Sequence, residues 1–531
     1  MSGFATVDVV EGRPRLAPSY SPRTVPELLA RRAEADPDGI AVAGFTESGE
    51  DLERLGFAEL RERSMALASR LLELGLDEGG AVAWLADNSN GLEGLVLHHA
   101  IAAAGGVGVP VNPRLASPEV ASILARAEAR LVVHSRAAQP RAAEAVEMVA
   151  ARPTVVSLSE LYGAGAMAGH LAAVAERSAR LRPREPAVIL FTSGTTGTSK
   201  GVVHSHETAI AAAIGWADAM RLARGDLLQS PYPVFSGAAL HFNGLACLWA
   251  GAGYAIDQAD VAGMLARVEE LGSTVFVAVP AIYQFWLAEP GFADRRLGSL
   301  RLLDYGGAAM PPSVIERLRE ALSGVALLQT YGLTEAGPGG TYLPEEYAVS
   351  KLGSIGNRGA GGLEFRVLDA HDEDVGPDGE GELVVRGPAT MLGYHADPGA
   401  TAAVLSSDGW LRTGDIVRAD ADGFLFFVDR NKDIIVRGGY NIGSLEVEGA
   451  LCSHPEVLEA AAVGVPHPRL GEQVAAFVVR RHDSALSAAE LLEHCRPLLA
   501  DFKLPSRIEL RTELPRNAAG KVLKGALREE G

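Results

Sequence analysis

Short apolar runs alternate with longer segments of helical periodicity through the first half of the chain. The apolar runs lie at 81–85, 107–110, 131–134, 154–158, 187–191 and 274–279. Apolar residues recur at helical spacing in 22–38, 57–76 and 95–104. Helices that alternate with short buried strands are typical of βαβ units, so this pattern predicts a mostly parallel sheet covered by helices.

The pattern changes after about Ser354. Strand-like segments separated by Asp and Gly turns, at 365–368, 381–386 and 424–428, favour a small antiparallel β unit. Beyond Asp429 the sequence predicts helices at 444–453 and 488–499 and strands at 459–463 and 473–480. These later elements indicate a separate small domain, joined to the rest through the polar run 429–433.

The composition limits the kinds of ligand that the chain can attract. Its 531 residues include 48 basic and 67 acidic side chains, a formal net charge of −19. This charge excludes a general attraction to nucleic acid or to an anionic membrane, so an anionic ligand must be held by a local cluster of donors. Six of the basic residues are lysines: Lys200, Lys351, Lys432, Lys503, Lys521 and Lys524.

The sequence carries no sign of secretion, membrane insertion or structural metal. Its three cysteines lie far apart, which predicts neither a disulfide framework nor a Cys-x-x-Cys metal site. No basic segment followed by an apolar run begins the chain, and the most apolar stretch, 95–111, is too short and too rich in glycine to span a bilayer. A cytoplasmic protein is therefore expected.

The run at 187–191 leads directly into a loop rich in hydroxyl side chains and glycine. The loop contains Thr192, Ser193, Gly194, Thr195, Thr196 and Lys200. Glycine lets backbone N–H groups approach a ligand, hydroxyls donate to phosphate oxygens and lysine supplies charge, which makes the loop a candidate phosphate site. It is not a Walker A loop, because that loop requires Ser or Thr after the lysine and here Gly201 follows. The alternative to a phosphate site is that this loop is an ordinary surface turn.

The loop resembles the signature loop of the adenylate-forming superfamily, which includes acyl-CoA synthetases and other AMP-dependent ligases, luciferases and nonribosomal peptide adenylation domains. Further segments resemble the motifs of this family, in the same order along the chain. They lie at 304–308, 329–335, 409–415, 429–433 and 515–521. The resemblance therefore extends over nearly the whole chain.

The resemblance and the patterning together predict an α/β fold. The expected large N-terminal domain, residues 1–429, has two doubly wound α/β subdomains and a small β-barrel-like subdomain. A hinge at 430–433 would connect it to a small, mobile α+β C-terminal domain at 434–531.

The resemblance also implies an acyl-CoA ligase reaction in two halves. A carboxylate attacks the α-phosphorus of ATP to give an acyl-adenylate and pyrophosphate, and the thiol of CoA then displaces AMP. ATP, Mg²⁺ and CoA are the expected cofactors. Two alternatives to this reaction stay open: a separate acyl-carrier protein as the thiol acceptor, and an enzyme that performs only one half-reaction. A homodimer is also left open.

Catalysis of this kind depends on positioning and on stabilising negative charge. The resemblance places Lys521 near the α-phosphate and the carboxylate, where an ammonium can bridge two anions. It assigns Thr334 a hydrogen bond to the α-phosphate and Glu335 the Mg²⁺ ion, since that ion prefers carboxylate and phosphate oxygens.

The same resemblance implies a nucleotide site. Besides the loop residues, it would contain Gly307, Ala308, Thr330, Tyr331, Asp415, Phe427 and Arg430. Asp415 would accept from both ribose hydroxyls, with Arg430 on the other side of the ribose. Tyr331 and Phe427 would sandwich the adenine, although a core position in a strand is an alternative for Phe427.

The hinge and the thiol tunnel are implied in the same way. Lys432 would lie at the hinge, where a rotation of the small domain exchanges the two half-reactions. Arg437, Gly438 and Gly439 would then line the CoA tunnel, where glycine lets pantetheine pass close to the backbone.

The chain departs from the family pattern at the acyl pocket, which is predicted to contain Phe235, Ser236, Gly237, Gly306 and Gly332. Ser236 stands where a His is usual, and Phe235 would fill part of its role. Small residues leave room, which favours a bulky or cyclic acid, while a long fatty chain stays open. No acidic residue lies in 232–243 to meet an α-ammonium, which disfavours an amino acid substrate.

Overall fold

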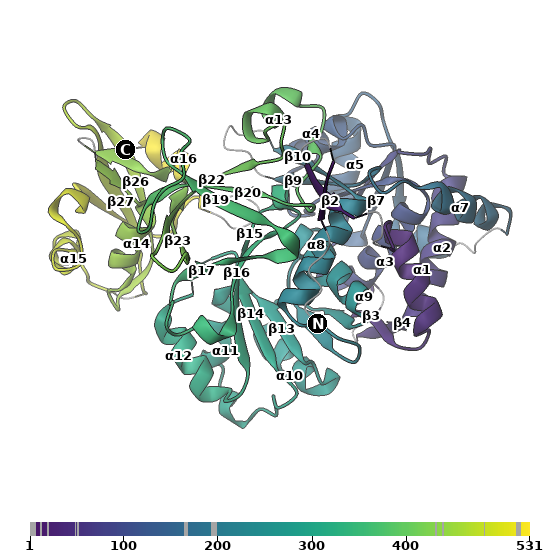
Figure 1. Ribbon diagram of the computed structural model, residues 1–531, viewed down its shortest axis with the longest axis horizontal. Coiled ribbons are helices and arrows are strands. Elements are labelled where there is room, and N and C mark those ends of the chain that lie inside the picture. The colour runs from purple at the N-terminus through teal and green to yellow at the C-terminus, as the bar shows by residue number, and fades with distance from the viewer. Residues whose placement is uncertain are drawn as a thin grey trace. The chain divides into compact units, whose positions relative to one another are not determined.

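The structure is a computed structural model of the 531-residue chain. It describes residues 7–10, 13–17, 21–47, 49, 52–163, 168–192, 199–308, 310–430, 433–437, 440–482, 484–516 and 522–530. The chain forms two compact units (Figure 1). Residues 1–365 and 384–412 build the first unit, and residues 366–383 and 413–531 build the second.

The first unit contains a seven-stranded sheet in the order β21-β10-β9-β6-β5-β7-β8. Its strands are β5 Ala81–Leu85, β6 Val107–Pro110, β7 Leu131–His134, β8 Thr154–Ser157, β9 Pro186–Thr192, β10 Lys200–Ser205 and β21 Gly393–Tyr394. Strands β5 to β9 run parallel. At one edge, β10 pairs antiparallel with β9, and β21 then pairs antiparallel with β10.

A nine-stranded sheet in the order β18-β16-β15-β14-β13-β11-β12-β3-β4 forms the other half of this unit. Its strands are β3 Ile40–Gly44, β4 Glu53–Gly56, β11 Leu227–Ser230, β12 Gly253–Ile256, β13 Val275–Ala278, β14 Leu302–Gly306, β15 Ala326–Gly332, β16 Gly340–Leu343 and β18 Arg358–Gly359. Neighbours from β3 to β15 are parallel, whereas β4, β16 and β18 join antiparallel. The two largely parallel sheets confirm the prediction from the alternating pattern.

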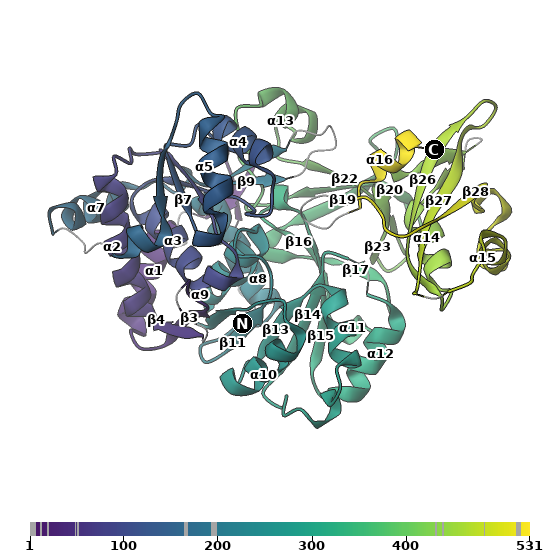
Figure 2. The same cartoon turned by 180° about the vertical axis from the view of Figure 1, so that it is seen from behind.

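Helices connect and flank these strands in both views of the chain (Figures 1 and 2). They are α1 Val25–Ala35, α2 Phe57–Glu73, α3 Gly91–Ala103, α4 Ser117–Arg126, α5 Gln139–Glu147, α6 Leu158–Gly163, α7 Ala168–Arg180, α8 His206–Ala219, α9 Ala246–Ala250, α10 Val261–Leu271, α11 Pro280–Ala288, α12 Pro312–Ala321 and α13 Pro398–Val404. A π-helix, η3, spans Ala238–Leu245, and short 3₁₀ turns occupy Asn88–Asn90, Arg136–Ala138, Phe292–Asp294, Thr334–Ala336, Glu345–Tyr347, Ala360–Gly362 and Asp501–Lys503. Two further short strands are the hairpin β1 Val7–Val10 and β2 Arg13–Leu16, and β17 lies at Ser354–Gly356.

The second unit contains most residues of the strand-like segments predicted after Ser354. Strands β19 Glu364–Leu368, β20 Glu380–Arg386, β22 Leu411–Ala419 and β23 Leu425–Arg430 follow the order β23-β22-β20-β19. The remainder comprises β24 Ile435–Arg437, β25 Tyr440–Ile442, α14 Ser444–Cys452, β26 Val457–His467, β27 Gly471–Arg480, α15 Ala488–Cys495, β28 Arg507–Arg511 and α16 Lys524–Glu530. The fold is thus α/β, with a large N-terminal and a small C-terminal part, as the sequence predicted.

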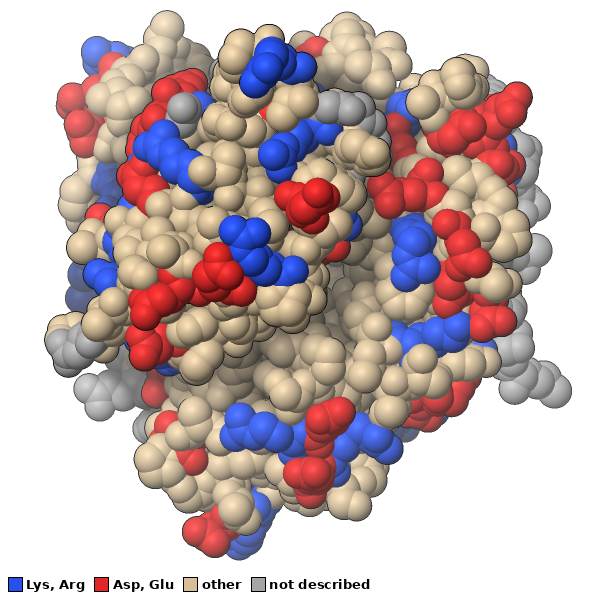
Figure 3. All heavy atoms as spheres, turned by 90° about the vertical axis from the view of Figure 1, so that its left-hand side faces the viewer, with Lys and Arg blue, Asp and Glu red and all other residues tan. Residues whose placement is uncertain are grey.

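One face of the molecule shows both signs of charge side by side. On the face drawn in Figure 3, basic and acidic side chains are interspersed. Within the described part of the chain, no helix combines the length and the apolarity needed to cross a bilayer.

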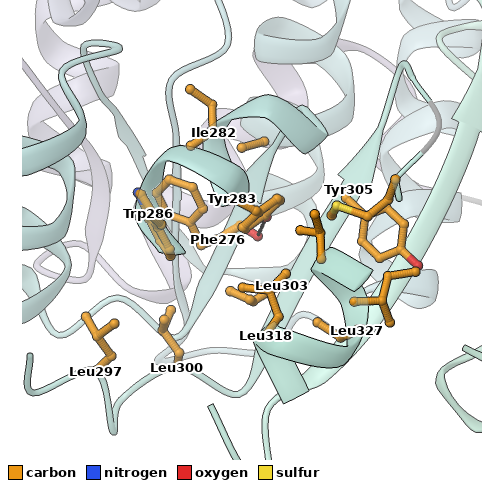
Figure 4. Close-up of a cluster of buried hydrophobic side chains, with 14 of the residues drawn as sticks. Phe276, Ile282, Tyr283, Trp286, Leu297, Leu300, Leu303, Tyr305, Leu318 and Leu327 are labelled. Atoms are coloured by element: carbon orange, nitrogen blue, oxygen red, sulfur yellow. Dashed lines mark hydrogen bonds between the residues drawn. The ribbon is translucent and has the colours of Figure 1, made fainter. Parts of the chain in front are cut away.

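A buried aromatic cluster supports the part of the nine-stranded sheet that carries the predicted motifs (Figure 4). Trp286 and Phe276 have ring centroids 4.2 Å apart, and both are fully buried. The Tyr283 hydroxyl donates to the backbone carbonyl of Asp304 on β14. Helix α11 is therefore attached to the sheet by both apolar packing and a buried hydrogen bond.

We predict that Trp286→Ala lowers the free energy of unfolding by about 3–5 kcal/mol, because it removes a fully buried ring and leaves a cavity. The neighbouring Phe285 is 56% exposed, so Phe285→Ala should change the same quantity by less than about 1 kcal/mol. Urea unfolding followed by far-ultraviolet circular dichroism measures both. Equal effects of the two substitutions would contradict this placement of α11.

Candidate active site

The ends of β14 and β15 bring two of the predicted segments together. The strands are parallel, and Gly306 lies opposite Thr330 in their register. The carboxyl ends of parallel strands meet at one edge of a sheet, which is where ligands bind in open α/β folds. Gly307 and Ala308 therefore emerge beside Tyr331, Gly332 and the turn that follows.

The turn Thr334–Ala336 is held from two sides. The buried imidazole of His204 donates from Nε2 to the Thr334 carbonyl at 2.8 Å. Burial lowers the pKa of His204 to about 3, so the ring is neutral at physiological pH. The Met391 N–H donates to the Glu335 carbonyl at 2.9 Å. These bonds fix the backbone from which the Thr334 and Glu335 side chains project.

Tyr394 connects two of the predicted phosphate and metal residues. Its hydroxyl donates to Glu335 Oε1 at 3.0 Å, and the Lys200 ammonium lies 4.7 Å from the centre of its ring. Burial, with the neighbouring Glu335 carboxylate, raises the pKa of the Tyr394 phenol, so the hydroxyl remains a donor. Lys200, Tyr394 and Glu335 thus form a continuous cation–ring–carboxylate row.

Sequence reasoning did not identify Tyr394. Its position follows from the pairing of β21 with β10, in which Tyr394 lies opposite Val202, and from the His395 N–H, which donates to the Gly201 carbonyl at 2.7 Å. The two strands are far apart along the chain, and no motif in the single sequence signals that they pair. The one local sign is Gly393, whose φ of +150° suits an edge strand where a side chain would meet Thr401.

The predicted phosphate loop is bounded by residues that face each other. Thr192 ends β9 and lies opposite Lys200 at the start of β10. Ser193, Gly194, Thr195 and Thr196 lie outside the described residues. The hinge residue Lys432, the tunnel residues Gly438 and Gly439, and Lys521 also lie outside them.

Ser236, which replaces the usual His, has a local structural role. Its hydroxyl accepts from the Ala239 N–H, in the first turn of the π-helix that follows, at 3.1 Å. The next residue, Gly237, packs closely against Leu190 and Pro338. A Cβ placed on Gly237 would lie 2.9 Å from the Leu190 side chain and 3.9 Å from that of Pro338. The structure therefore brings the segment of Phe235, Ser236 and Gly237 close to the chain after Glu335.

The glycines of the predicted acyl wall are explained by backbone contacts. A Cβ on Gly306 would lie 2.6 Å from the Thr330 carbonyl oxygen, and one on Gly332 would lie 2.7 Å from that of Pro338. Gly307 has a φ of +75°, which disfavours a side chain. Glycine is required there by close strand packing, so these positions do not by themselves indicate a large acid.

The predicted ribose residues lie together in the second unit. Asp415 and Arg430 are paired across β22 and β23, and Arg430 Nε lies 2.9 Å from Asp415 Oδ1. The Asp415 side chain is 1% exposed, so Arg430 supplies the charge that a buried carboxylate needs. Phe427 is half-buried rather than part of the core. Arg437 donates to the Phe502 carbonyl.

The chain matches the AMP-binding enzyme family over residues 29–395 and the AMP-binding enzyme C-terminal domain over residues 446–521. It is 37% identical over 526 residues to a methyl-dioxo-octahydroindenyl-propanoyl:CoA ligase of Mycobacterium tuberculosis, with 96% of this chain and 99% of the relative covered. It is 36% identical over 502 residues to a feruloyl-CoA synthase of Amycolatopsis, with 94% and 97% covered. The structure of Bacillus subtilis o-succinylbenzoate coenzyme A synthetase with ATP and magnesium ion superposes with a TM-score of 0.83 at 28% identity, covering 94% and 98%.

We predict that Gly306→Ala lowers the free energy of unfolding by about 1–3 kcal/mol, because the added methyl group would clash with the Thr330 backbone. A Cβ on Gly298 would meet none of the described atoms within 4 Å, so Gly298→Ala should be neutral or slightly stabilising. Chemical denaturation of both variants tests the difference. If Gly306→Ala left the free energy of unfolding unchanged, glycine at this position would serve to leave room for a ligand instead.

Proposed function

We propose that this chain, which belongs to the AMP-binding enzyme family and is an acyl-CoA ligase, activates a bulky or cyclic carboxylic acid. Three relatives support this choice of acid by their names, which refer to an octahydroindenyl propanoic acid, ferulic acid and indoleacetic acid. ATP and CoA are substrates of the AMP-forming ligase family. Since both are abundant in the cytoplasm, we place the reaction there.

The observation that carries the proposal is the row of Lys200, Tyr394 and Glu335 at the carboxyl edge of the sheets. Attack of a carboxylate on the α-phosphorus builds negative charge, so the first half-reaction needs cations held in fixed positions. Stacking on Tyr394 restrains the Lys200 ammonium. Thr334, whose backbone His204 fixes, would donate its hydroxyl to the α-phosphate.

Glu335 fits the Mg²⁺ ion expected for this reaction. Its carboxylate is half-buried and offers hard oxygen ligands, which Mg²⁺ prefers. Tyr394 occupies Oε1, and no other protein donor to this carboxylate is present in the described part of the chain. Mg²⁺ would be held by Glu335 and phosphate oxygens, and would supply charge neutralisation at the phosphates.

We further propose that the residues of the second unit complete the nucleotide site. Asp415 would accept from the ribose hydroxyls, supported by Arg430, and Phe427 would pack on the adenine opposite Tyr331. A rotation at the hinge 430–433, around Lys432, would move the domain 434–531 relative to 1–429. It would exchange Lys521 for the tunnel residues Arg437, Gly438 and Gly439 between half-reactions.

The first test separates the two half-reactions. Lys521→Ala should lower acid-dependent ATP–pyrophosphate exchange by about 100-fold or more, because it removes charge beside the reacting phosphate. Formation of the CoA thioester from supplied acyl-adenylate should be retained. Lys503→Ala is a matched control, since Lys503 pairs with Glu446 at 2.6 Å and should leave both rates unchanged. Full exchange activity in Lys521→Ala would refute the role of this lysine.

The same assays identify the acceptor. Thioester formation with free CoA supports the proposal, whereas activity only with an isolated acyl-carrier protein would favour carrier loading. Exchange without transfer to either thiol would indicate an enzyme of one half-reaction.

The metal assignment is tested by Glu335→Gln. We expect this variant to need a several-fold higher Mg²⁺ concentration for half-maximal exchange, because an amide is a poorer ligand for a hard cation. The surface variant Glu345→Gln, which removes an ion pair with Arg221, serves as the control. An unchanged Mg²⁺ dependence in Glu335→Gln would show that the ion binds elsewhere.

A further inference from the structure

A single carboxyl group, that of Asp304, is buried in the predicted acyl region with half of its hydrogen-bonding capacity unused. Asp304 is 0% exposed. Its Oδ1 atom accepts from Thr330 Oγ1 at 3.1 Å, but Oδ2 has no hydrogen-bond partner among the described residues. Buried polar atoms are almost always satisfied in native proteins, so Oδ2 requires an explanation.

Asp304 lies among the segments that the sequence assigned to the acyl pocket. Residues two apart on a strand share a face, so Asp304 projects on the same side of β14 as Gly306. The Thr330 hydroxyl that donates to Asp304 is also 2.6 Å from a Cβ placed on Gly306. Tyr232, which leads into the segment Phe235–Gly237, lies close enough to Asp304 for the two groups to interact. Asp304 thus lies near Gly306 and near the residue that precedes the segment Phe235–Gly237, both of which the sequence assigns to the acyl pocket.

The surroundings keep this carboxyl group uncharged. No ion pair to Asp304 is present in the described part of the chain, and the titratable groups that sense it are the phenols of Tyr232, Tyr283 and Tyr305. Burial raises the pKa of Asp304 well above its ordinary value, and the Thr330 hydrogen bond offsets this only in part.

The position of the proton follows from the hydrogen bond to Thr330. With the Thr330 hydroxyl donating to Oδ1, the proton of the neutral carboxyl group lies on Oδ2. A protonated carboxyl group has one O–H donor, and here that donor has no acceptor in the described residues. The group that would complete this network is therefore an acceptor atom.

We infer that Asp304 donates a hydrogen bond from Oδ2 to an uncharged oxygen, a ring ketone or hydroxyl, on the body of the acid. Asp304 is thereby a positioning residue that selects oxygenated acids over plain hydrocarbon acids. The inference rests on the proposed function, since it requires an acid to bind in this pocket. A cationic amine is the competing ligand, and it is disfavoured because pairing it with one buried carboxylate would desolvate both charges.

The wild-type enzyme gives the first test. The specificity constant kcat/KM is measured for cyclohexylpropanoic acid, its ring ketone and its ring amine, and for the same three derivatives of a fused bicyclic propanoic acid. We expect the ketone to exceed the hydrocarbon by about 10-fold or more in at least one ring series, because a site with a buried donor rejects a ligand that leaves it unpaired.

Two variants then assign that preference to Asp304. Asp304→Leu should abolish the preference by lowering kcat/KM for the ketone while the hydrocarbon is unchanged or improved. Asp304→Asn should keep the preference within about 3-fold, because its amide can accept from Thr330 and still donate from Nδ2. Thermal unfolding of both variants controls for folding, and the wild-type comparison does not depend on either.

The outcomes separate the inference from the function on which it rests. Equal kcat/KM for ketone and hydrocarbon in both wild-type series overturns the inference, as does an equal loss for both acids in Asp304→Leu. A preference for the amine that Asp304→Asn abolishes overturns it in favour of an ionised Asp304. Failure of every acid, including ferulic and indoleacetic acids, to support ATP–pyrophosphate exchange contradicts the proposed function instead.

Discussion

The close approach of the β14, β15 and β16 backbones is the constraint on which the site in the first unit depends. Side chains at Gly306, Gly332 and Gly340 would each collide with a neighbouring backbone carbonyl. Because these positions carry no side chains, the strand ends converge. Thr330, Tyr331 and the Thr334 turn therefore reach the same edge of the nine-stranded sheet. The glycines therefore shape the edge of the sheet, and the predicted site residues Thr330 and Tyr331 are positioned by strand β15.

A second constraint is the pairing of β21 with β10, which holds Tyr394 between Lys200 and Glu335. In a chain of net charge −19, long-range electrostatic repulsion opposes the binding of the anions ATP and CoA. Short-range interactions must therefore supply the affinity. A cation stacked on an aromatic ring and a carboxylate oriented by a phenol are already ordered before the nucleotide arrives, which lowers the entropy lost on binding.

The sequence alone predicted the parts of this molecule that depend on local pattern. Buried parallel strands are short and apolar, so the runs at 81–85 and 107–110 could be recognised from composition and spacing. Tyr394 could not, because its role depends on a strand pairing between distant segments. Ser236 was recognisable as a departure from the family pattern, but its hydrogen bond with the Ala239 N–H depends on backbone geometry. Asp304 stood in a motif that was identified, yet nothing in its neighbours along the chain reveals that it is buried without a cation.

Asp304 and Asp415 illustrate how burial alone does not determine what a carboxyl group can do. Both side chains are almost inaccessible to solvent. Arg430 lies 2.9 Å from Asp415, so this group can stay ionised and accept hydrogen bonds. Asp304 has phenols and a hydroxyl around it, and in that setting the neutral acid is the stable form. Because an ionised carboxylate only accepts and a protonated one also donates, the two residues can recognise opposite hydrogen-bonding partners with the same side chain.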